Sequence, residues 1–298
     1  MTSRVTQGMM SIQLLRNLNS NMLRMDTMQN QLSTGRKINK PSDDPVGISF
    51  SMRYRSEYSA NEQYRANVDA AISWMSYTDK MMEQTGSVLH RVRELTVGAA
   101  NGSNPDDALQ TVRIEIEQLK EQLLNIANSQ FNGKYVFNGQ MTDKPPYSTA
   151  DPVSELADIG EIKFEVGAGV KMAVNINGNQ IFGTDENEDN MFRLMDDLML
   201  ALDESNFSAI SSMLGKIDSR MEVVLEVRAD VGAKMNRLEL AEDRLLDIGI
   251  NLQALTTKTE DADMAIVITN LKMAENVYQA SLSAGSRLIM PSLMDFLR

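Results

Sequence analysis

The feature that most constrains this chain is an apolar heptad pattern that runs through its second half. Ten of thirteen consecutive heptad slots are apolar: Ile210, Leu214, Ile217, Met221, Val224, Val231, Met235, Leu238, Leu245 and Leu252. Steps of three and four residues place these side chains on one face of an α-helix. At about 1.5 Å per residue the helix would be roughly 65 Å long, which exceeds what a compact domain of this size usually holds. The pattern therefore predicts an elongated rod of side-by-side helices.

The first half of the chain supplies helical partners for this rod. Asn104 is expected to cap one of them, Pro105 to occupy its first turn, and Asn132-Gly133 to end it. A second partner is expected within residues 48–97. The two apolar seams are Leu109, Val112, Ile116, Leu119, Leu123 and Ile126, and Val68, Ile72, Met75, Met82 and Leu89.

Between the helical halves the apolar period changes to two residues, which is typical of strands. One run holds Ile162, Phe164 and Val166, and a second run from Val170 to Ile176 follows Gly167-Ala168-Gly169. This arrangement predicts a β-hairpin. Residues 135–139 are expected to add a strand and residues 177–178 a turn, so residues 134–187 are predicted to form a small β-rich insert.

Each end of the chain carries a narrow apolar seam of its own. A lone amphipathic helix gains little stability in water, so each end must pack on the rod, on the other end, or on neighbouring molecules. The candidate assembly residues are Leu15, Leu18, Met22, Met25 and Leu32 near the start, and Leu271, Tyr278, Leu282, Ile289, Leu293 and Phe296 near the finish. Ile268 belongs to the same predicted C-terminal seam.

Composition argues against most enzyme classes. The chain has no cysteine and one histidine, His90, so it lacks the parts of disulfides, thiolate metal sites and histidine-based catalysis. A net charge of -12 disfavours nucleic acid and anionic membranes as partners. No apolar run is long enough for a signal peptide or a membrane span. We therefore expect no catalysis, cofactor or metal.

Two acidic clusters have structural interpretations. Asp185, Asn187, Asp189 and Asp196 are spaced somewhat like calcium ligands, but Asn190 stands where the sharp turn needs glycine, so we interpret the run as the start of a helix. The segment 41–45, with sequence PSDDP, is expected to break one helix at residue 40. It should start another with Asp44 as its cap.

Five separated motifs, in order, resemble the flagellin superfamily. They are QLSTGRKINKPSDDPVG at residues 31–47, RVRELTV with AANG at 91–102, GAKMNRLE at 232–239, EDADMAI at 260–266 and YQASL at 278–282. Residues 133–147 and 291–298 resemble the hook-associated protein 3 family within this superfamily. The resemblance covers roughly residues 1–147 and 205–298.

The resemblance implies a mainly α fold with terminal coiled-coil arms, and a structural role without catalysis. It implies a ring-shaped homo-oligomer at the junction of flagellar hook and filament, next to hook-associated protein 1 and filament flagellin. It also implies an export chaperone and export without a cleaved signal peptide to the extracellular flagellum. The expected segments are the N-terminal arm 1–43, the first rod half 44–133, the insert 134–187, the second rod half 188–257 and the C-terminal arm 258–298.

Three alternatives remain open at this point. The first is filament flagellin, which differs in copy number and in self-polymerisation. The second is an enzyme carried on a flagellin scaffold, but the zinc protease inserts of some flagellins require two histidines and this chain has one. The third is recognition by host innate receptors, which in some flagellins involves the helix that residues 91–97 resemble.

Overall fold

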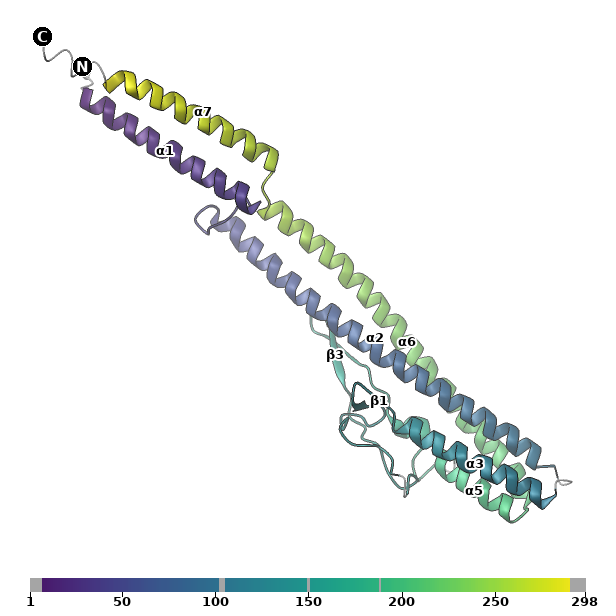
Figure 1. The fold of residues 1–298 in the computed structure, drawn as a ribbon. Helices are drawn as coiled ribbons and strands as arrows, with labels where there is room; N and C mark the ends of the chain where they lie inside the picture. The colour runs from purple at the N-terminus through teal and green to yellow at the C-terminus, as the bar shows by residue number, and fades with distance from the viewer. Residues whose placement is uncertain (1–6, 102–104, 149–150, 188, 290–298) are drawn as a thin grey trace, which may run out of the picture. The chain divides into compact units, whose positions relative to one another are not determined.

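The protein is mainly α-helical, as predicted, in a computed structural model that describes residues 7–101, 105–148, 151–187 and 189–289 (Figure 1). Two small antiparallel sheets accompany the helices. The helices are α1 (Gln7–Thr34), α2 (Pro45–Ala99), α3 (Asp106–Ala127), α4 (Gly178–Phe182), α5 (Met191–Asp203), α6 (Phe207–Glu260) and α7 (Met264–Ile289). The strands are β1 (Gln130–Phe131), β2 (Lys134–Tyr135), β3 (Lys163–Gly167) and β4 (Val170–Ala173).

The chain divides into two compact units. Unit 1 comprises residues 1–60 and 248–298, and unit 2 comprises residues 61–247. Unit 2 holds nearly all of the buried apolar side chains. Their core is built from the inward faces of α2, α3, α5 and α6, and α3 lies beside α5 within it (Figure 1).

The predicted heptad seams form this core. In α6, Ile217, Val224, Val231 and Leu238 are buried at seven-residue intervals. In the predicted seam of α3, Leu109, Ile116, Leu123 and Ile126 are buried, while Val112 and Leu119 are partly buried. This helix ends at Ala127 and not at residues 132–133. Asn132 and Gly133 have positive φ angles and make the turn between β1 and β2. The cap position of α3 is held by Pro105, which was predicted to lie inside the helix, so the prediction of Asn104 as the cap was wrong. Asn104 itself lies outside the described residues.

The predicted hairpin at residues 162–176 is confirmed. β3 pairs with β4 in antiparallel register, with Phe164 opposite Met172. Two neighbouring predictions were wrong. The strand expected at 135–139 stops at Tyr135, and Asn177 does not form a turn but caps α4 by accepting a hydrogen bond from the Asn179 amide. An Asn-Gly pair suits a turn and a helix start equally well, because Asn is also a good cap.

An aromatic cluster packs beside these elements in unit 2. Phe137, Tyr147, Phe182 and Phe192 are all buried, with ring centroids 5.2–5.9 Å apart. The Tyr147 hydroxyl has no hydrogen-bond partner among the described residues. Burial raises the pKa of this hydroxyl above its ordinary value. The cluster thus carries one polar atom that its apolar surroundings do not satisfy.

Replacing Tyr147 with phenylalanine should stabilise unit 2. The change keeps the ring contacts and removes a buried hydroxyl whose desolvation is uncompensated, so we expect the free energy of unfolding to rise by about 1 kcal/mol. Urea denaturation of both proteins followed by circular dichroism measures the difference. A loss of stability would mean that the hydroxyl has a partner after all.

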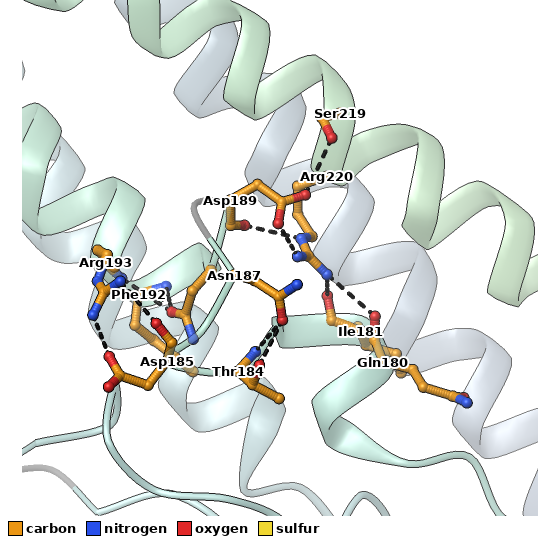
Figure 2. A network of polar contacts seen from close by, with 11 residues as sticks. Gln180, Ile181, Thr184, Asp185, Asn187, Asp189, Phe192, Arg193, Ser219 and Arg220 are labelled. Atoms are coloured by element: carbon orange, nitrogen blue, oxygen red, sulfur yellow. Dashed lines mark hydrogen bonds and ion pairs between the residues drawn. The ribbon is translucent and has the colours of Figure 1, made fainter.

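A polar network joins α4, α5 and α6 (Figure 2). Arg220 is only 4% exposed; its guanidinium pairs with the Asp189 carboxylate and donates to the backbone oxygens of Asp189, Gln180 and Ile181. Asn190 caps α5 by accepting hydrogen bonds from the amides of residues 192 and 193. The acidic run therefore starts a helix, as interpreted from the sequence.

Unit 1 has very little core of its own. Among its described residues the buried apolar side chains are Ile38, Leu252 and Val267. α1 packs along α7 (Figure 1), which is the coiled-coil arm pairing that the resemblance implied. α1 ends at Thr34, earlier than the break predicted at residue 40, because Gly35 adopts a positive φ of 72°.

Candidate assembly surface

Polar residues within 31–47 build the turn between α1 and α2. Asp44 caps α2, and its Oδ1 accepts hydrogen bonds from the amides of Val46 and Gly47. Asp43 Oδ2 accepts bonds from two amides of the preceding loop. A Cβ at Gly47 would overlap the Asp44 carboxylate and lie 2.6 Å from Ile38 Cδ1. Glycine is therefore needed where the loop folds back onto α2.

The last residue of α6, Glu260, connects this turn to the start of α7. Its side chain is 4% exposed and accepts hydrogen bonds from Ser51 Oγ at 2.7 Å and Arg55 Nη2 at 2.5 Å. Its backbone oxygen accepts a bond from the Lys37 amide at 2.6 Å. Burial by itself raises the pKa of the Glu260 carboxyl, but the hydrogen bonds from Arg55 and Ser51 outweigh burial and lower it.

This lowered pKa predicts a pH-dependent contribution to stability. A carboxyl whose pKa is lower in the folded state stabilises the fold above its unfolded pKa, about 4.3 for glutamate, and this contribution is lost as pH falls through the lowered folded value. Glu260→Gln should therefore be less stable than the parent chain at pH 7, and the difference should shrink in acid. Urea midpoints of both proteins between pH 7 and pH 3 measure this, and a difference independent of pH would contradict it.

The seam between α1 and α7 is narrow and only half-buried. On α1 it holds Leu14, Leu18, Met25, Met28 and Leu32, with Ser11, Asn21 and Gln31 on the same face. On α7 it holds Val267, Leu271, Tyr278 and several small residues, Ala274, Ser281 and Gly285. The two helices approach each other closely at Gly285, where a Cβ would lie 2.6 Å from Leu14 Cδ2. Small residues on one helix thus accommodate large ones on the other.

A second apolar stripe on each arm faces solvent. On α1, Leu15 is 64% exposed and Met22 is 54% exposed, seven residues further on. On α7, Ile266 and Met273 are exposed at the same spacing, followed by Val277. Contiguous exposed apolar surface of this kind marks interaction sites in soluble proteins. Covering each such side chain is worth roughly 1.5–3 kcal/mol.

The predicted assembly residues divide between the two surfaces. Leu18, Met25, Leu32, Leu271 and Tyr278 lie in the α1–α7 seam, whereas Leu15, Met22 and Leu282 are exposed. Ile289 ends α7, and nothing is described of its side chain; Leu293 and Phe296 lie outside the described residues.

Sequence reasoning missed part of the intramolecular seam. It chose Ile268, which is exposed, where the structure buries Val267. It also passed over Leu14 and Met28, because steps of three and four from Leu18 lead to Leu15 and Met22 as readily as to these residues. Ala274, Ser281 and Gly285 escaped because a search for large apolar residues ignores small ones.

The exposed stripes of the two arms offer a surface for packing. No group of three or more His, Cys, Asp or Glu side chains in the described parts of the chain could hold a metal ion. None of the helices, over the residues searched, is long and apolar enough to cross a membrane. What the arms present is apolar area arranged at heptad spacing, which suits another helix.

Two family models match the chain. The model for the bacterial flagellin N-terminal helical region matches residues 5–142, and the model for the C-terminal helical region matches residues 214–297. The first match covers α1, α2 and α3, and the second covers most of α6 together with α7. The intervening segment, which contains β3, β4 and α5, lies outside both models.

Individual flagellar proteins are also similar to this chain. Flagellar hook-associated protein 3 of Escherichia coli K12 is 27% identical over 85% of this chain and 87% of its own length. The flagellin of Bacillus subtilis 168 is 27% identical over 93% of both chains. The crystal structure of flagellar hook-associated protein 3 from Legionella pneumophila has a similar fold, with a TM-score of 0.62 and 18% identity over 70% of this chain and 98% of that one. The chain therefore belongs to the bacterial flagellin family, whose members are structural proteins of the flagellum.

Proposed function

We propose that this chain is a structural subunit of the bacterial flagellum that joins the hook to the filament. The observation that carries the proposal is the composition of unit 1, whose arms expose apolar heptad stripes while the unit buries very few apolar side chains of its own. Such a unit gains most of its apolar burial from neighbouring subunits. Because unit 1 exposes more apolar side chains on its arms than it buries, we infer a structural role in a polymer.

The position at the junction is supported by the relatives. Two curated relatives from enteric bacteria are named flagellar hook-associated protein 3, and they match 85% and 93% of this chain. Solved structures with the same fold carry this name or are described as a flagellar junction protein. The matches to the two curated relatives extend over most of the chain, so the likeness is not confined to a single motif.

The partners follow from this position. We propose that copies form a ring within a helical tube and contact hook-associated protein 1 on one side and filament flagellin on the other. An export chaperone would accompany the chain before its secretion to the cell exterior, without cleavage of a signal peptide. In this scheme segments 1–43 and 258–298 are the arms, 44–133 and 188–257 the helical body, and 134–187 an insert that faces outward.

Immunogold labelling of isolated flagella tests the position directly. An antibody against the insert should label a single band at the distal end of the hook. Deletion of the gene should leave hooks without filaments and cause flagellin to be lost to the medium. Label spread along the whole filament would overturn the proposed position.

A filament subunit is the second candidate, favoured by the match to Bacillus subtilis flagellin over 93% of both chains. The two candidate functions differ in how many subunits can add to a growing assembly. Purified filament subunits should elongate filament fragments without limit, whereas a junction subunit should add a bounded layer to hook ends. Electron microscopy of seeded reactions distinguishes these outcomes.

A further inference from the structure

The methionines of this chain are distributed unevenly between the two units. Among the described residues of unit 2, Met141 is exposed and the other methionines are buried or half-buried. In unit 1 both arms carry methionines that are at least 40% exposed. They are Met9, Met10 and Met22 on α1, and Met264 and Met273 on α7, and we call these five residues the arm methionines.

Two of the arm methionines belong to the exposed apolar stripes. Met22 lies seven residues after Leu15 on α1, and Met273 lies seven residues after Ile266 on α7. The Met22 sulfur accepts one long hydrogen bond, from the Tyr278 hydroxyl at 3.8 Å, and the residue is still 54% exposed. Both side chains are therefore open to small molecules in solvent, whether or not the two arms stay paired in the free subunit.

The thioether sulfur of an exposed methionine reacts with two-electron oxidants such as hydrogen peroxide. A sulfur lone pair attacks one peroxide oxygen, so that an S–O bond forms as the O–O bond breaks. Sulfur loses two electrons, the peroxide gains them, and after a proton transfer the second oxygen leaves as water. The product, methionine sulfoxide, is polar where the thioether was apolar. Because the chain has no cysteine, no thiol of its own competes for the oxidant.

We propose that the arm methionines are oxidation sites that control assembly, and that sulfoxide at Met22 and Met273 excludes a free subunit from the polymer. The inference rests on the proposed function, in which neighbouring subunits cover the exposed stripes. A sulfoxide oxygen covered there without a hydrogen-bond donor loses its water at a cost, and the cost recurs in every copy. After assembly the same sulfurs are covered, so peroxide acts mainly on the free subunit.

Peroxide treatment of the purified chain before it meets isolated hooks tests the proposal. The dose is set by peptide mass mapping, so that the arm methionines are oxidised and the buried methionines of unit 2 are not. Catalase then removes the peroxide, which protects the hook proteins from oxidation. The amount of subunit that sediments with the hooks should fall about tenfold after treatment, while circular dichroism should show that the helices of unit 2 are retained.

Leucine variants separate the arm methionines from other targets of peroxide. Leucine keeps nearly the volume of methionine and has no sulfur. A chain with all five arm methionines changed to leucine should therefore add to hooks equally well before and after treatment. Restoring Met22 and Met273 in that chain should bring back the tenfold loss. Met141→Leu, which removes the exposed methionine of unit 2, should leave the loss unchanged.

Three results would overturn the inference: equal addition of treated and untreated parent chain, an undiminished loss in the five-leucine chain, or no return of the loss when Met22 and Met273 are restored. The proposed function fails in a different way, when the untreated chain elongates filament fragments without limit in place of adding a bounded layer to hooks. The peroxide comparison is then made on filament fragments. A chain that adds to neither seed would overturn both proposals.

Discussion

Leu15→Asp should abolish flagellar assembly and leave the free subunit folded. Leu15 is 64% exposed on the outward stripe of α1, so a charge there costs the monomer little, about 0.5 kcal/mol or less. In an assembly the same position would be covered by a neighbour, where an unpaired carboxylate is costly and the cost recurs in every copy. The measurement is swarming motility of a deletion strain that expresses the variant, together with the melting temperature of the purified subunit. Leu282→Asp, at a position of α7 that is 46% exposed, should behave in the same way.

Two control variants show whether the effect of Leu15→Asp is specific to the outward stripe of α1. Leu200→Asp places the same charge on a leucine that is 60% exposed in unit 2, outside the arms, and should leave motility intact. Leu18→Asp places it in the α1–α7 seam and should lower the helix content of the monomer as well as block assembly. If Leu15→Asp strains swarm normally, the outward stripe of α1 is not an assembly surface.

Arg220→Met should cause a large loss of stability in unit 2. Arg220 is 4% exposed, and its removal leaves the Asp189 carboxylate without its cation and the oxygens of Gln180 and Ile181 without a donor (Figure 2). Removing one partner of a buried ion pair costs about 3–5 kcal/mol. For a unit of this size that loss lowers the melting temperature by roughly 10 °C, which differential scanning calorimetry measures.

Arg193 provides the control within the same network. It also forms an ion pair, with Asp185, but its side chain is 38% exposed. Solvent screens such a pair, so Arg193→Met should cost about 1 kcal/mol or less. Equal losses for the two variants would show that the buried pair contributes no more than the exposed one.

Periodicity in the sequence was sufficient to determine the helical architecture. Ile217, Val224, Val231 and Leu238 of α6 were predicted as seam residues and are buried in unit 2. The predicted seams of α2 and α3 are buried or partly buried there. Asp44 as the cap of α2 was also predicted, since a short acceptor side chain before Pro45 satisfies the first free amides of a helix. The hairpin of β3 and β4 followed from the change of period to two. All of these patterns repeat or close over short distances along the chain.

Only the tertiary structure decided which residues of the arms face inward and which stay exposed. Periodicity locates an apolar stripe but does not distinguish Leu18, in the seam, from Leu15, in solvent, because the choice depends on small partners such as Gly285 across the helix pair. The buried positions of Arg220 and Glu260 were equally invisible, since their partners lie 31 and 205 residues away in sequence. These charged side chains are buried because distant segments supply their hydrogen bonds. Contacts between distant segments leave no periodic pattern in the sequence.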